Sequence, residues 1–138
     1  LSSFLRHAIN KESLIPLSLE IKMVENYVKI ENIRFNNKIV LSVTINREIE
    51  TIQVPKFSIQ LLVENAIKHG YLQKELRIDI SIENNMITVQ NNGKITKEIH
   101  YGTGLQNLQD RLKLLKIGTL SHHSKPNKME FKILLEVI

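Results

Sequence analysis

Residues 60–70 read QLLVENAIKHG, and this stretch decides the interpretation of the whole chain. On a helix, the three- and four-residue spacing places four of its side chains on one face: Leu61, Asn65, Lys68 and His69. An amide oxygen beside phosphate oxygens suits Mg²⁺, which takes few protein ligands, and the two basic groups would neutralise phosphate charge. The alternative is a surface helix that ends in Lys-His-Gly, where basic residues complement the helix dipole.

A second polar segment follows an apolar strand, where residues 89–94 read VQNNGK. Asn91 at the strand end can present a hydrogen-bonding side chain to the edge of a base, while Gly93 lets a flat ligand approach. A plain turn is the alternative for this segment.

A third segment, residues 102–105, reads GTGL and opens a helix that contains Asn107 and Arg111. Glycines before a helix N-terminus leave backbone N–H groups pointing outward, which makes a phosphate site. The sequence contains no Gly-x-x-x-x-Gly-Lys-Ser/Thr motif, so a Walker-type loop is excluded.

The first third of the chain is predicted to be helical and then extended. One helix is expected over residues 2–9, and a second begins at the signal formed by Pro16 and Ser18. The predicted apolar face of this second helix consists of Leu19, Met23, Tyr27, Ile30 and Arg34, widened by Val24, Val28 and Phe35. Asn36-Asn37 ends it, and residues 38–45 then alternate as a strand.

The remaining two thirds alternate between helices and hairpins. Pro55 fits the first turn of a helix that runs to about His69 and is closed by Gly70 as a left-handed cap. Residues 76–83 and 86–90 form a hairpin, residues 105–116 a helix, and residues 118–124 and 129–137 a final hairpin. This order predicts an α+β fold, a two-layer sandwich with helices on one face of a mixed, mainly antiparallel sheet, preceded by a helical segment.

Composition narrows the class of protein. The 138 residues, 42% hydrophobic and 24% charged, suit one globular domain with one core, and no apolar run is long enough to span a membrane. The net charge of +5 suggests an anionic partner, but the basic residues are scattered and only 5% of residues are aromatic, which disfavours a nucleic-acid surface. Because the chain opens at Leu1 without an initiator Met, we expect a piece of a longer protein.

Taken together and in this order, the three segments resemble the Bergerat ATP-binding fold of the GHKL superfamily, which includes histidine kinases, type II topoisomerases, heat-shock chaperones and MutL. Residues 63–70 resemble the N-box of LytS-like sensor kinases, and residues 102–112 resemble their closing glycine box. Upstream, four short stretches are similar to the helix that precedes that family's catalytic domain: Leu5-Arg6, Leu19-Glu20, Glu25-Asn26-Tyr27 and Ile33-Arg34-Phe35.

The resemblance implies ATP and Mg²⁺ as cofactors. It places Asn65 on the metal, and Lys68 and His69 near the phosphates, as the catalytic set. It places the phosphate-facing loop and the start of its helix at Gly102, Thr103, Gly104, Leu105 and Asn107. Asn91, followed by Gly93, stands where the family usually has an Asp that accepts from the adenine amino group. Its amide oxygen can still accept that bond, and the loss of negative charge is expected to cost about 1 kcal/mol of affinity.

Two departures favour the kinase branch of the superfamily. The lid between the glycine boxes, residues 94–101, is short, whereas chaperones and topoisomerases carry longer ones. The water-activating Glu of the superfamily's ATPases lies four residues before the metal Asn, and here that position is Leu61. Glu64 lies about 100° round the helix from Asn65, so it is not assigned as the base.

The resemblance also implies the surroundings of the domain. The phosphoacceptor histidine is expected upstream, because His7 does not lie in the family's Phe-x-x-Asn-x-Leu-Asn-like segment. Residues 1–36 are then the end of the dimerisation helices, and residues 37–138 the catalytic domain of an inner-membrane protein's cytoplasmic part. A response regulator and a second copy of the chain, joined through the upstream helices, are the expected partners. A degenerate nucleotide-binding scaffold and a basic nucleic-acid-binding domain are the alternatives.

Overall fold

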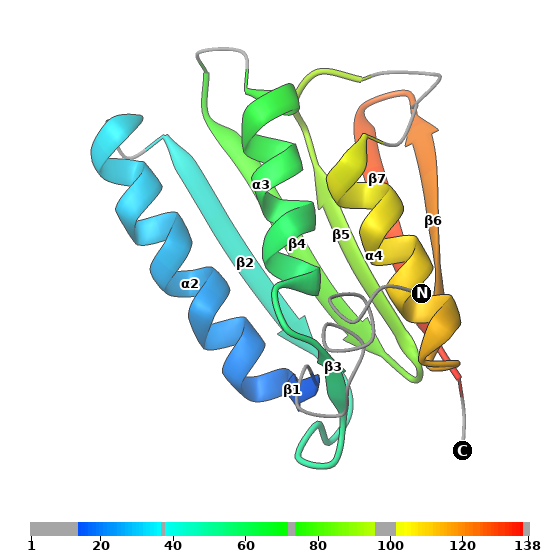
Figure 1. Cartoon of the computed structure of the whole chain (residues 1–138). Helices are drawn as coiled ribbons and strands as arrows, with labels where there is room; N and C mark the ends of the chain where they lie inside the picture. The colour runs from blue at the N-terminus through cyan, green and yellow to red at the C-terminus, as the bar shows by residue number, and fades with distance from the viewer. Residues whose placement is uncertain (1–13, 37, 72–73, 96–101, 137–138) are drawn as a thin grey trace.

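The computed structural model describes residues 14–36, 38–71, 74–95 and 102–136 (Figure 1). Along the chain the elements are β1 (Leu14–Pro16), α2 (Leu17–Arg34), β2 (Ile39–Ile45), β3 (Gln53–Pro55), α3 (Ser58–Gly70), β4 (Leu76–Glu83), β5 (Met86–Asn91), α4 (Thr103–Leu114), β6 (Gly118–Lys125) and β7 (Lys128–Leu135). The helix predicted over residues 2–9, His7, and the predicted lid beyond Ile95 lie outside the described residues.

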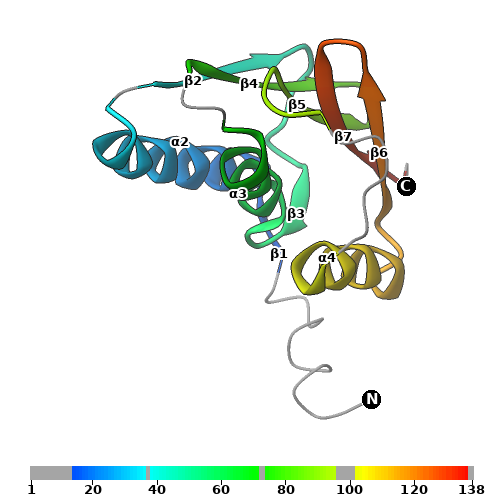
Figure 2. The same cartoon turned by 90° about the horizontal axis from the view of Figure 1, so that it is seen from above.

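Five strands form one sheet in the order β2-β4-β5-β7-β6. The pairing of β2 with β4 is parallel and the other three pairings are antiparallel. The three helices lie side by side on one face of this sheet, as Figure 2 shows from above. The predicted two-layer α+β fold with a mixed, mainly antiparallel sheet is confirmed.

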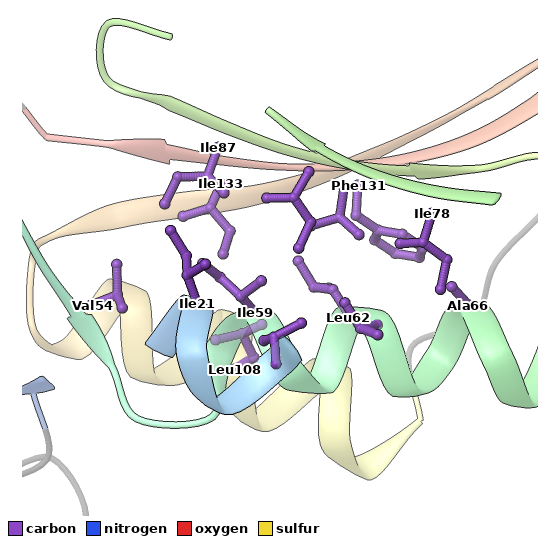
Figure 3. Packing of buried hydrophobic residues seen from close by; sticks show 14 of the residues in the cluster. Ile21, Val54, Ile59, Leu62, Ala66, Ile78, Ile87, Leu108, Phe131 and Ile133 are labelled. Atoms are coloured by element: carbon purple, nitrogen blue, oxygen red, sulfur yellow. The ribbon is translucent and has the colours of Figure 1, made fainter. Parts of the chain in front are cut away.

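The core fills the space between the two layers. On β4, Ile78, Ile80 and Ile82 are at most 1% exposed, and they alternate with polar residues on the open face, as a half-covered strand requires. Ile59 and Leu62 of α3 point at this sheet face, together with side chains of α2 and α4 (Figure 3). Each such buried side chain contributes about 1.5–3 kcal/mol.

The predicted apolar face of α2 was partly wrong: Val24 and Val28, which widen it, are buried, but its main series is not. The buried stripe is Leu17, Ile21, Val24 and Val28, whereas Leu19 is 46% and Ile30 is 65% exposed. Both series follow helical spacing and occupy different sides of the helix. Only packing against α3 and β2 decides which of them is buried.

The start of α3 also differs from the prediction. Pro55 belongs to β3, which pairs antiparallel with β1, and the helix begins three residues later at Ser58. Phe57 precedes it with a left-handed φ of 68°. The carboxylate of Glu20 on α2 accepts the N–H groups of Phe57, Ile59 and Gln60 at 2.9–3.0 Å, so α3 is capped from another helix.

The predicted left-handed cap at Gly70 was wrong. Gly70 is the last residue of α3, and no glycine of the described residues has a positive φ. A side chain is excluded here by space, because a Cβ would stand 2.9 Å from Oδ1 of Asn91. The glycine therefore permits the end of α3 to approach the end of β5.

The other predicted elements are confirmed with small shifts of their ends. The strands 38–45, 76–83 and 86–90 and the final hairpin are present, and α4 begins two residues earlier than expected. Strands β1 and β3 were not predicted. Within the described part of the chain, every helix is too short or too polar to cross a membrane.

Candidate functional site

A cleft of about 700 Å³ lies where the second half of α3, the start of α4 and the adjoining ends of β5 and β7 meet. It is lined by residues that are far apart in the sequence: Leu61, Glu64, Asn65, Ala66, Lys68, His69, Gly70, Asn91, Lys94, Gly102, Thr103, Gly104, Leu105, Met129 and Phe131. Its volume is that of a pocket for a small organic ligand.

Helix α3 supplies one wall of the cleft. Its four residues predicted to share a face all line the cleft: Leu61, Asn65, Lys68 and His69. Asn65 is half-buried, and its amide makes no hydrogen bond with any described residue. Lys68 and His69 occupy the last turn and are exposed. The wall therefore offers a free amide near its middle and two basic groups at its end.

The first turn of α4 faces this wall. Gly102 is the N-cap of the helix and has no capping side chain, and the first bond within the helix is from the N–H of Gln106 to the carbonyl of Gly102. The N–H groups of Thr103, Gly104 and Leu105 therefore have no partner inside the helix. Since all three residues line the cleft, their N–H groups are available to an anionic ligand at its edge.

The far end of the cleft is built by the strands. Asn91, at the end of β5, is 6% exposed, and its Oδ1 accepts the N–H of Gly93 at 2.8 Å. Met129 lies directly opposite Asn91 on β7, and Phe131 lies two residues further along the same strand. This end combines one buried amide with apolar walls.

Eight of the ten predicted site residues come together in this cleft: Asn65, Lys68, His69, Asn91, Gly102, Thr103, Gly104 and Leu105. Gly93 and Asn107 are not among the residues that line it. Gly93 packs against α3, since a Cβ there would stand 2.0 Å from the carbonyl oxygen of Gly70. Asn107 is exposed on α4.

Sequence reasoning did not assign several lining residues. Met129 and Phe131 reach the cleft through the pairing of β5 with β7, and a register between distant strands leaves no local signal. Lys94 is the last residue of the strand-end segment VQNNGK and could have been included on its basic character. Glu64 also lines the cleft, and its carboxylate accepts from the Gln60 side chain at 3.4 Å.

Charge in the cleft favours an anionic ligand. Lys68 and Lys94 carry ammonium groups at its rim and His69 adds an imidazole, against the single carboxylate of Glu64. Among the described residues no three His, Asp or Glu side chains gather to hold a metal ion. A cation here would depend on Asn65 together with oxygens of the ligand, and Mg²⁺ binds phosphates in that way.

Outside the cleft, Glu20 is fully buried at the start of α3. Burial raises the pKa of Glu20, and the three backbone N–H groups and Arg111 oppose this rise. Burial also lowers the pKa of Arg111, and Glu20 opposes that change. The pair lies beneath the start of α3 and does not line the cleft.

Comparison with known proteins gives consistent matches. A family model described as histidine kinase matches residues 1–39. Sensor protein LytS of Bacillus cereus is 31% identical over 122 residues, which cover 74% of this chain and 21% of that protein. Sensor histidine kinase BtsS of Escherichia coli strain K12 is 33% identical over 119 residues, which cover 80% of this chain and 21% of that protein. The chain thus spans about a fifth of the length of these curated relatives.

A solved structure shares the fold. Histidine kinase ThkA in complex with response regulator protein TrrA matches with a TM-score of 0.67 and 18% identity, covering 90% of this chain and 41% of that chain. The arrangement of the described helices and sheet is therefore one that histidine kinases have.

Proposed function

Because this chain is a homologue of the LytS-like sensor histidine kinases, we propose that it binds ATP with Mg²⁺ and serves as the catalytic domain of such a kinase. The convergence of two polar elements on one cleft carries the proposal. The free amide of Asn65 and the basic end of α3 lie on one wall, and the open N–H groups of α4 face them. A triphosphate fits between these walls, since it supplies both negative charge and metal-binding oxygens.

The reaction is transfer of the γ-phosphoryl group to a histidine upstream of residue 1. As the bond between the imidazole nitrogen and phosphorus forms, the bond from phosphorus to the bridging oxygen breaks and ADP leaves. Such transfer needs positioning and charge neutralisation more than covalent help. Lys68 and His69 would supply positive charge, and Asn65 would hold the ion.

The absence of an ATPase-type base agrees with this role. Leu61 lies in the cleft at the place of the superfamily's water-activating Glu, and it packs against Gly104, where a Cβ would stand 3.1 Å from it. A leucine cannot activate water. Glu64 also lines the cleft, and we assign it no catalytic role.

Partners and location follow from the same proposal. The phosphoryl group would pass from histidine to a response regulator, and a second copy would join through the upstream helices, in a protein held at the inner membrane by segments outside this chain. The division after residue 36 stays a prediction, and α2, which precedes it, packs into the same core as the sheet.

Substitution of Asn65 tests the proposal. We expect Asn65→Ala to remove the part of the affinity for ATP that depends on Mg²⁺, by roughly tenfold or more, because the ion loses its protein ligand. Calorimetric titration with and without Mg²⁺ measures this effect. Asn26→Ala, an exposed asparagine on α2, is the control and should bind as the wild type does.

Equal binding of MgATP by Asn65→Ala would remove Asn65 from the site. Binding of ATP without any transfer to a supplied upstream helix would favour a scaffold. Salt-sensitive binding to random DNA, unaffected by nucleotide, would favour the nucleic-acid alternative.

A further inference from the structure

The side chain of Asn91 is buried with one of its two polar atoms unused. It is 6% exposed and lines the cleft. Oδ1 accepts the N–H of Gly93 at 2.8 Å, whereas Nδ2 has no hydrogen-bond partner among the residues that the structure describes. Nδ2 is unpartnered and open to the cleft, so it is available to a ligand there.

The orientation of this amide is fixed by its neighbours. The N–H of Gly93 can only donate, so the oxygen of Asn91 must face it, and turning the amide over would bring two donors to 2.8 Å. Gly70 packs against the same oxygen, as a Cβ there would stand 2.9 Å from it. The oxygen is therefore enclosed by the end of α3 and by Gly93, and the NH₂ arm is the part left for a ligand.

The surroundings of Asn91 suit a flat ring with one polar edge. Met129 lies opposite Asn91 in the sheet and is 5% exposed, and Phe131 and Ala66 complete an apolar lining. The open N-terminus of α4 lies against Leu61, nine residues before Gly70 on α3, and so at the other end of the cleft. Resting on the proposed function, a nucleoside triphosphate would place its base here and its phosphates there.

We infer that Asn91 determines base specificity, and that this chain prefers a purine with a carbonyl at C6, as in hypoxanthine or guanine, to adenine. The amino group at C6 of adenine is a donor, and the NH₂ arm of Asn91 is a donor too, so the two do not pair. A carbonyl at C6 accepts from that arm. An Asp at this position would differ, because one oxygen could accept from Gly93 and the other from the adenine amino group.

Calorimetric titration of the chain with ATP and with inosine triphosphate, both with Mg²⁺, tests the inference. Inosine triphosphate carries the carbonyl at C6 without the 2-amino group of guanine, and it differs from ATP only at C6 and at the adjoining N1, which bears a proton in hypoxanthine. The wild type should bind it about tenfold or more tightly than ATP, and Asn91→Asp should reverse the order.

Asn92→Asp is the matched control, because it adds the same charge one residue along. Its side-chain oxygen accepts the N–H of Arg77 at 2.8 Å, and it does not line the cleft. This variant should keep the wild-type preference. Tighter binding of ATP than of inosine triphosphate by the wild type, or equal preference in wild type and Asn91→Asp, would overturn the inference while leaving the proposed function standing. No binding of either triphosphate would instead overturn the proposed function.

Discussion

Two glycines allow the end of α3 and the end of β5 to meet. Gly93 has no side chain that would obstruct the contact. The carbonyl oxygen of Gly70 accepts the N–H of Lys94 at 2.8 Å. The contact places Asn91, between these two glycines, at the floor of the cleft. At Gly70 and Gly93, glycine is required because the two backbones approach closely, and not because a turn needs a positive φ.

Gly93→Ala should therefore destabilise the fold. The new Cβ would lie 2.0 Å from the carbonyl oxygen of Gly70. Because the Cβ is fixed to the main chain and the oxygen belongs to the main chain, no side-chain rotation can relieve the clash. We expect a loss of about 2–3 kcal/mol in the free energy of unfolding, measured by urea denaturation. Gly102→Ala is the control, since nothing lies within 4 Å of a Cβ there, and it should change stability by less than about 0.5 kcal/mol.

Sequence analysis identified Asn91 and Gly93, but it explained Gly93 by the approach of a flat ligand. The pattern of two amides and a glycine after a strand indicates a special backbone position without indicating what approaches it. The approaching group is the end of α3, more than 20 residues earlier in the chain. A contact between residues so far apart in the sequence cannot be predicted from a local motif.

Among the elements, α2 and α3 are joined by one buried carboxylate. Glu20 is fully buried and accepts three N–H groups from the start of α3, which has no cap of its own. The residue at the N-cap position is Phe57, with φ of 68°, a conformation that costs a bulky residue about 1–2 kcal/mol. The bond from Phe57 to Glu20 helps to hold that conformation.

Glu20→Ala should destabilise the fold by about 2–4 kcal/mol, because it leaves buried donors at the start of α3 without acceptors. Urea denaturation measures the loss. Glu25→Ala makes the same change on the exposed side of α2 and should cost less than about 0.5 kcal/mol. Equal losses in the two variants would show that the cap contributes nothing.

The stability difference between wild type and Glu20→Ala should depend on pH. Because burial raises the pKa of Glu20 above its usual value of 4.5, the folded chain binds this proton more tightly than the unfolded chain. Stability contributed by Glu20 is then fully present below 4.5 and declines as the pH rises through the raised pKa. Urea denaturation at a series of pH values should show that the stability difference between the two proteins grows as the pH falls. A stability difference that shrinks as the pH falls would show that folding lowers the pKa of Glu20.

The sequence predicted where α2 lies but only part of the face that it buries, namely Val24 and Val28. Two apolar series run along it at helical spacing, and the choice between them depends on α3 and β2. The start of α3 was misplaced for a related reason. Its capping carboxylate lies 37–40 residues upstream, so Pro55 was the nearest visible start signal.

For the molecule as a whole, the order of elements was enough to predict the layers. Alternating strands and amphipathic helices have few arrangements that bury their apolar faces, and the sheet with helices on one face is one of them. Local sequence patterns could not predict the strand order β2-β4-β5-β7-β6 or its one parallel pair. For the same reason the walls of the cleft from α3 and α4 were predicted, and the floor from β7 was not.

As a whole, the chain should bind nucleotide without labelling itself. The proposed acceptor histidine lies upstream, and transfer requires an imidazole held in line with the leaving oxygen, within about 3.5 Å. Incubation with γ-³²P-labelled nucleotide should give no acid-labile label on this chain. Addition of the upstream helix on a separate chain should restore labelling.

His7→Gln is the control for that experiment. Label on this chain alone that disappears in His7→Gln would show that the acceptor was misplaced. Absence of label even with the complete upstream helix would indicate a domain that binds nucleotide without transfer.

The carboxylate of Glu20 has a mechanical consequence. Three backbone N–H groups at the first turn of α3 donate to this one carboxylate, so α2 cannot slide past the start of α3 without breaking these bonds. Asn65 lies six residues beyond Ile59, about 9 Å along the same rigid helix. A displacement of α2 would therefore also move the start of α3, and with it Asn65, the proposed metal ligand.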